Sequence, residues 1–140
     1  MVHLASSFGS FDTFLRGADA FWSVDLAAMN NSGITGSAVL AVNTEDDGTR
    51  YLNISIAAEG LTPDVRHAQH VHGTFDDDGN PSDARLPDLG DDADVDGFIE
   101  VLEGLGAYGD ILLPLVGRDG ALPLTDSNGN SDVHSELPAG

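Results

Sequence analysis

The sequence predicts an all-β protein, an antiparallel β-sandwich formed by a single domain over residues 1–140. Three observations predict this fold. The first half of the chain alternates apolar and polar residues as strands do, an apolar run near residue 111 is bounded by glycines, and turn residues separate these segments. The length fits one domain, and a hydrophobic fraction of 41% is enough to form a core.

The first half contains the clearest strand. Residues 51–58 place Leu52, Ile54, Ile56 and Ala58 on one face and Asn53 and Ser55 on the other, as a half-buried strand requires. Residues 36–42 are the expected hairpin partner, joined to it through the polar turn 43–48. Residues 21–26 predict an earlier strand. The N-terminal segment, residues 1–19, has Phe8, Phe11 and Phe14 at helical spacing, so we expect a short helix or a segment that packs across the sheet.

The second half is less regular. Residues 73–106 are rich in Asp, Gly and Pro, and we expect an acidic, metal-binding loop insertion there, because a loop this long is uncommon unless it is functional. Residues 111–116 predict a buried strand with Pro114 at an edge or a bulge. Residues 125–130 are turn-like, and we expect the chain to end at 137–140 without a clear final strand.

The charge limits the classes of partner. The formal net charge is −19, from 24 acids against five bases, all of them Arg. Such a surface repels phosphate backbones and anionic leaflets, which argues against nucleic-acid binding and membrane attachment. Residues 76–103 hold 11 acids and one Arg, a net charge of −10. Metal ions are therefore the expected partners of this segment, whereas the rest of the Lys-free surface is typical of a saline background.

Residues 92–103 match the complete EF-hand calcium-loop pattern. Asp92, Asp94 and Asp96 stand at positions 1, 3 and 5, and Glu103 stands at position 12. Gly97 at position 6 permits the sharp turn, Phe98 offers a backbone carbonyl, Ile99 anchors the loop to the core, and Glu100 could contribute through water. Because Pro and Gly residues flank the loop, we expect only a single helical turn over 98–103 and a structural role for calcium. The acidic residues 76–83 fit a solvated turn better than a second site.

Three histidines offer a different site. On a strand, His70 and His72 project to the same face, where two imidazoles can share copper or zinc. His134 could supply a further ligand if the tail returns across the sheet. The alternative is that these imidazoles hydrogen-bond to backbone and acidic groups without a metal.

The residues also carry a family resemblance. The succession 26–38, then Ala58-Glu59-Gly60-Leu61 and His67-Ala68-Gln69-His70-Val71-His72-Gly73, resembles the CHRD (chordin-type) domain and the bacterial Cu/Zn superoxide dismutase-like proteins. The similarity covers roughly residues 20–120. It implies a Greek-key β-sandwich and a secreted, extracellular or periplasmic location; the alternative is a cytoplasmic location in a halophile.

The resemblance does not extend to dismutase activity. Only His70 and His72 match the metal ligands of those enzymes residue for residue, no bridging His follows His72 before His134, and the chain has no Cys. We therefore expect a non-enzymatic, exported module stabilised by calcium, with an unspecified protein or glycan partner. The alternative is a copper or zinc redox protein that uses His70 and His72. A halophilic domain without a specific metal is the third interpretation.

Overall fold

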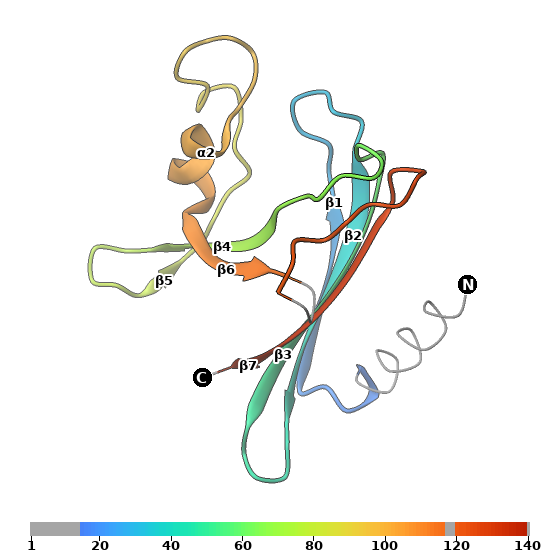
Figure 1. Cartoon of the computed structure of the whole chain (residues 1–140). Helices are drawn as coiled ribbons and strands as arrows, with labels where there is room; N and C mark the ends of the chain where they lie inside the picture. The colour runs from blue at the N-terminus through green and yellow to red at the C-terminus, as the bar shows by residue number, and fades with distance from the viewer. Residues whose placement is uncertain (1–14, 117–119, 140) are drawn as a thin grey trace. The chain divides into compact units, whose positions relative to one another are not determined.

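The computed structural model describes residues 15–116 and 120–139, and only the backbone of residues 132–139 (Figure 1). Its elements are β1 (Ala20–Leu26), β2 (Thr35–Thr44), β3 (Arg50–Glu59), β4 (Gln69–Phe75), β5 (Pro81–Ser82), α2 (Val101–Tyr108), β6 (Asp110–Leu115) and β7 (Ser131–Ala139). The described chain is mostly β, with two antiparallel sheets and one short helix. The contacts divide it into two compact units. The expected N-terminal helix with Phe8, Phe11 and Phe14 lies outside the described residues.

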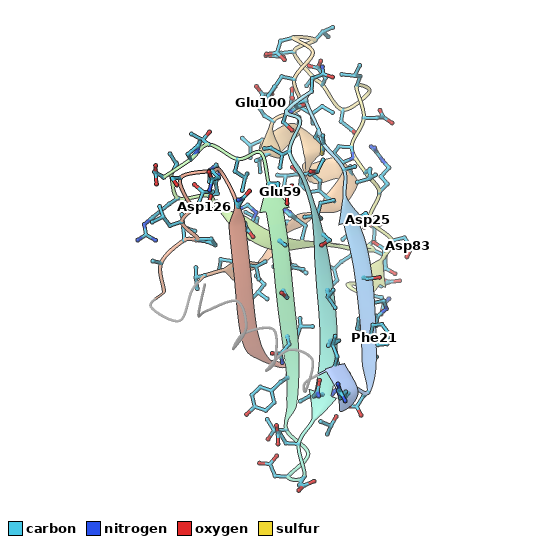
Figure 2. The ribbon with its side chains drawn as sticks, turned by 90° about the vertical axis from the view of Figure 1, so that its right-hand side faces the viewer. Phe21, Asp25, Glu59, Asp83, Glu100 and Asp126 are labelled. Atoms are coloured by element: carbon cyan, nitrogen blue, oxygen red, sulfur yellow. The ribbon has the colours of Figure 1, made fainter. Side chains whose placement is uncertain are left out.

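The first unit is built on a four-stranded antiparallel sheet in the order β1-β2-β3-β7, whose strands run side by side in Figure 2. The predicted hairpin of β2 and β3 is confirmed, with Leu40 opposite Ile54 and Val42 opposite Leu52. The predicted first strand is confirmed as β1. At the centre of β3, Ile54 is 2% exposed and Asn53 is 1% exposed. The prediction that Asn53 lies on an open face is therefore wrong, because this inner strand is covered on both faces at its centre.

The prediction that the chain ends without a final strand is also wrong. β7 pairs with β3 over nine successive positions, from Ser131 opposite Ala58 to Ala139 opposite Arg50. The sequence of β7 gives little sign of a strand because polar residues and a proline dominate it. The strand forms because β3 offers it a complete ladder of backbone hydrogen bonds.

A narrow ladder continues this pairing beyond the sheet. The Leu61 N–H donates to the carbonyl of Gly129, and Arg66 forms a bridge with Leu124. Thr125, only 2% exposed, fixes the ladder through its hydroxyl, which donates to the Thr62 carbonyl at 2.7 Å and accepts the Val65 N–H at 3.1 Å. Residues 61–66 and 124–129 are thus held side by side within the first unit.

Three loops share one hairpin design, at residues 45–49, 76–80 and 126–130. In each, the first residue donates its N–H to the carbonyl of the fifth and accepts the N–H of the glycine at the fourth place. These glycines have φ values of 88°, 83° and 77°, the left-handed conformation that a three-residue hairpin loop requires. Gly79 has open space around it, whereas a Cβ on Gly129 would collide with the carbonyl oxygen of Leu61.

The second unit contains a three-stranded sheet in the order β5-β4-β6, the helix α2 and residues 28–33. The predicted strand with Pro114 at an edge is confirmed as β6, but the prediction that it is buried is wrong, because Ile111 and Leu112 are 46% and 50% exposed and only Leu115 is buried. β6 is an edge strand, Pro114 lies opposite His70, and the register shifts between Val71 and His72. Pro114 is tolerated because an edge strand needs hydrogen bonds on one side only.

The helix α2 differs from the expected single turn over 98–103. It begins at Val101 and ends at Tyr108, because Glu100 and Glu103 form a reciprocal capping box at its start. Gly104 fits this helix because the Tyr108 ring lies against it, where a Cβ would collide with the ring. The Tyr108 hydroxyl donates to the Val101 carbonyl at 2.7 Å. Among the described helices, none has both the length and the apolarity needed to cross a membrane.

Candidate metal centre

The carboxylates of residues 92–103 converge in the second unit. One oxygen from each of Asp92, Asp94 and Asp96 lies within 4.8 Å of the other two, and Asp94 forms a second such group with Glu100 and Glu103. Asp94 therefore belongs to both groups. Each of these two groups of three carboxylates is compact enough to hold a metal ion.

Asp92 organises the turn of the loop. It is 9% exposed, and its two oxygens accept the N–H groups of Asp96 at 3.2 Å and Gly97 at 2.8 Å. Gly97 has φ 86°, which confirms the predicted sharp turn. Val95 has φ 61°, an uncommon conformation for a β-branched residue, and its side chain is exposed. The left-handed backbone at Val95 adds a second bend to the loop, beside the bend at Gly97.

The remaining carboxylates also receive backbone N–H groups. The Asp96 Oδ1 accepts the Phe98 N–H at 2.7 Å, and Asp94 Oδ1 accepts the Asp96 N–H at 3.3 Å. The side chain of Phe98 is half exposed, and the use of its carbonyl as a ligand stays a prediction. These hydrogen bonds hold the loop closed while each oxygen keeps a second lone pair for a cation.

Glu103 connects the beginning of the loop to the helix. Its Oε1 accepts the Ala93 N–H at 2.8 Å and its Oε2 accepts the Glu100 N–H at 3.0 Å. The hydrogen bond between the two glutamate side chains raises the pKa of Glu100 and lowers the pKa of Glu103. Two carboxyls this close favour a shared proton, since both charges together repel. A cation in the same place relieves the same repulsion.

Asn30 is a site residue that the sequence does not reveal. Its Nδ2 donates to the Ile99 carbonyl and its Oδ1 accepts the Ile99 N–H, each at 2.9 Å. The side-chain amide thus gives Ile99 the two hydrogen bonds that a neighbouring strand would give. Ile99, expected to anchor the loop through its side chain, is also anchored through its backbone. Asn30 and Asn31 have φ values of 54° and 53°. Two successive asparagines indicate a turn in the sequence, but they do not indicate that Asn30 binds Ile99.

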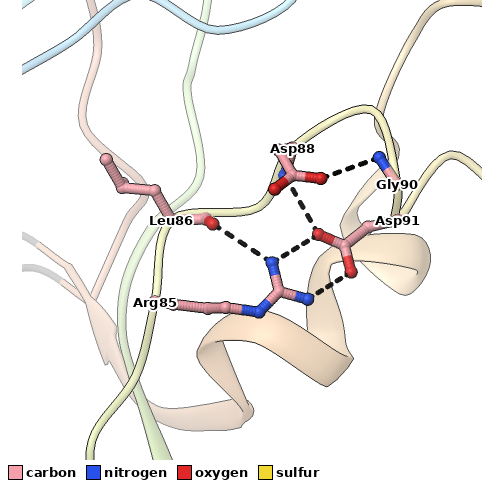
Figure 3. Close-up of polar contacts among 5 residues, drawn as sticks. All are labelled: Arg85, Leu86, Asp88, Gly90 and Asp91. Atoms are coloured by element: carbon pink, nitrogen blue, oxygen red, sulfur yellow. Dashed lines mark hydrogen bonds and ion pairs between the residues drawn. The ribbon is translucent and has the colours of Figure 1, made fainter.

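Arg85, the single base of residues 76–103, pairs with Asp91, the residue directly before the loop (Figure 3). Its guanidinium donates to both oxygens of Asp91, at 2.6 and 2.8 Å. These hydrogen bonds lower the pKa of Asp91 to about 2. Asp91 Oδ2 also accepts the Asp88 N–H at 3.0 Å. Arg85 is thereby held by Asp91 and directed away from neutralising the loop carboxylates.

The second acidic cluster is a hairpin turn. Asp76 Oδ1 accepts the N–H groups of Asp78 at 3.0 Å and Asn80 at 2.8 Å. The hydrogen bonds with Asn80 lower the pKa of Asp76. Asp126 repeats this arrangement with Asn128 and Asn130 at the loop before β7, labelled in Figure 2. These aspartates close turns, as expected for residues 76–83.

The three candidate histidines lie on strands of the two units. His70 and His72 are both on β4, with ring centroids 5.3 Å apart. The Nδ1 of His72 lies 3.0 Å from the Gly109 carbonyl, and its ring lies 4.4 Å from that of Tyr108. His134 lies on β7 opposite Ser55, with its side chain outside the described part. Among the side chains that are described, the groups of three or more ligands are the two acidic ones, and neither includes a histidine.

A comparison with protein-family models, curated proteins and solved structures finds no match for this chain.

Proposed function

We propose that this chain is a calcium-binding, non-enzymatic and exported β module in which calcium orders the acidic loop 92–103. The observation that carries the proposal is the pair of carboxylate groups on one short loop, Asp92 with Asp94 and Asp96 and then Asp94 with Glu100 and Glu103. A Greek-key sandwich of the CHRD or dismutase-like type is part of the same proposal, supported by the two antiparallel sheets.

The chemistry of the ligands favours calcium over other metals. All five side chains offer carboxylate oxygens, and calcium takes six to eight oxygens in a flexible geometry. Copper and zinc prefer nitrogen or sulfur, which these two groups lack. The oxygens of Asp92 and Glu103 each accept one backbone N–H, so each keeps a lone pair for calcium beside those of Asp94 and Asp96.

A pair of matched substitutions tests this function. Asp94→Asn removes one charge from the carboxylate shared by both groups, and Asp83→Asn removes one charge from an exposed position outside them, labelled in Figure 2. After treatment with chelator, the wild-type chain should gain thermal stability in millimolar calcium, as any ligand of the folded state provides. Isothermal titration should show at least about tenfold weaker calcium binding for Asp94→Asn, equivalent to about 1.4 kcal/mol. Asp83→Asn should bind as the wild type does.

Two results would contradict the proposal. One is an unchanged melting temperature of the wild-type chain between chelator and calcium. The other is an equal gain in molar potassium chloride alone, which would favour a halophilic domain without a specific ion.

A copper or zinc site is the second candidate, favoured by the adjacent rings of His70 and His72, whose centroids are 5.3 Å apart. If His72 donates Nδ1–H to the Gly109 carbonyl, its Nε2 is left to bind a metal, a common arrangement for histidine ligands. Copper binding by the wild-type chain, compared with the double variant His70→Ala and His72→Ala, tests it. Equal binding by both proteins would remove this candidate.

A further inference from the structure

A pocket of about 420 Å³ lies in the second unit beside the acidic loop. Three chain segments line it, and their apolar members are Ala28, Met29, Pro87, Leu89 and Ile99. Asn31 and Asp88 add polar groups to its wall. The pocket is thus an apolar recess at the edge of the most acidic segment of the chain.

Hydrogen bonds between protein groups hold two walls of this pocket. The Asn30 amide fastens Ile99 on one wall. On another, Asp88 accepts the Gly90 N–H at 2.7 Å and donates its own N–H to Asp91, which Arg85 holds (Figure 3). These contacts need no bound ion. The recess is therefore formed in advance, which reduces the entropic cost of binding a partner.

Large apolar side chains on the pocket wall remain exposed. Leu89 is 69% exposed and Met29 is 36% exposed. Exposed apolar groups gathered at one place are typical of an interaction surface. Here they stand among the 11 acids of residues 76–103, so the surface combines apolar contact with strong negative charge.

We propose that this pocket receives an apolar side chain from a basic, amphipathic segment of a partner protein. The negative charge attracts lysine and arginine, and bound calcium would neutralise only two of the ten net charges of residues 76–103. A second copy of the chain, at −19, and an anionic membrane are both repelled. The proposal goes beyond calcium binding, because hydrogen bonds of Asn30 and Asp91 hold two walls of the pocket whether or not calcium orders the rest of the loop.

Methionine labelling gives a direct test. The chain has two methionines, so a protein carrying ¹³C-methyl methionine has one signal from Met1 and one from Met29 in the pocket wall. The probe is a peptide of lysine and leucine with its leucines on one helical face. A peptide of equal charge with serine in place of leucine is its control. We expect the leucine peptide to shift the Met29 signal, and the serine peptide to leave it unchanged at physiological salt.

Two leucine variants locate the contact. Leu89→Ala removes an apolar group from the pocket wall, and Leu102→Ala removes one from α2, where Leu102 is 79% exposed and outside the pocket. Fluorescence anisotropy should show about tenfold weaker peptide binding for Leu89→Ala and little change for Leu102→Ala. Equal binding by both variants, or by the serine peptide, would overturn the proposal.

The experiment is run in calcium and in chelator to separate the two proposals. Peptide binding should persist in chelator, and Leu89→Ala should bind calcium as the wild type does. Loss of peptide binding in chelator would contradict a pocket formed by protein contacts alone. A chain that binds the peptide but no calcium would contradict only the calcium function.

Discussion

Replacing Asn30 with alanine removes the two side-chain hydrogen bonds that hold Ile99 of the metal loop, which we call the Asn30 clamp. The wild-type side chain makes two hydrogen bonds of 2.9 Å to the backbone of Ile99, and they join segments 69 residues apart. Each such bond contributes about 0.5–1.5 kcal/mol net, so losing both should lower the free energy of unfolding by about 1–3 kcal/mol. The substitution also places alanine in a left-handed conformation that asparagine tolerates better, which adds roughly 1 kcal/mol.

Asn31→Ala is the matched control for this prediction. Its φ of 53° is close to the 54° of Asn30, so the backbone contribution is nearly the same in both variants. The difference between them in urea unfolding isolates the two hydrogen bonds. Calcium titration should show weaker binding for Asn30→Ala and near wild-type binding for Asn31→Ala, because only Asn30 holds position 8 of the loop. Variants with equal midpoints and equal calcium affinity would refute the clamp.

Three further predictions concern stability. Gly129→Ala should destabilise the chain by about 1–3 kcal/mol more than Gly79→Ala. Both substitutions strain a left-handed turn, but only the alanine at 129 also collides with the Leu61 carbonyl. Chemical unfolding measures the difference, and equal losses of unfolding free energy would contradict this prediction. Gly106→Ala should stabilise α2 by about 0.5–1 kcal/mol, because alanine favours the helix and open space surrounds residue 106. Gly104→Ala should destabilise α2, because the Tyr108 ring occupies the place of the added Cβ. A higher melting temperature for Gly104→Ala than for Gly106→Ala would argue against this packing. Asp91 has a lowered pKa of about 2, so its ion pair contributes stability above pH 3.8 that is lost as the pH falls through about 2; an NMR titration of Asp91 with an ordinary midpoint would contradict this.

The sequence predicts the regular part of the fold well. Alternation identifies β2 and β3 because one face of each strand is apolar, and the glycines that bound 111–116 identify β6. β7 escapes prediction because its stability comes from pairing with β3, a contact between residues far apart in the chain. The predicted helical turn over 98–103 is misplaced, because the low helix propensity of Gly104 and Gly106 argues against a helix there. In the structure, the capping box and Tyr108 override this low propensity.

The candidate site divides in the same way. The carboxylate spacing of 92–103 is local, so the convergence of its acids could be expected from the sequence. The role of Asn30 could not, because only the fold brings it near Ile99, 69 residues away. The calcium assignment, the histidine site and the family resemblance stay predictions that the experiments above test.

The ladder between Leu61 and Gly129 has a consequence for the order in which the chain folds. Residues 60–130 separate β3 from β7, so during synthesis the edge of β3 has no final partner until the last strand is made. The second unit, apart from residues 28–33, lies within that interval. It can therefore form its own contacts before β7 is available to pair with β3. Because closure entropy rises by only about 0.6 kcal/mol for each doubling of loop length, this interval can change in length at little cost to the sheet. The ladder is therefore the natural position for exchanging one inserted unit for another.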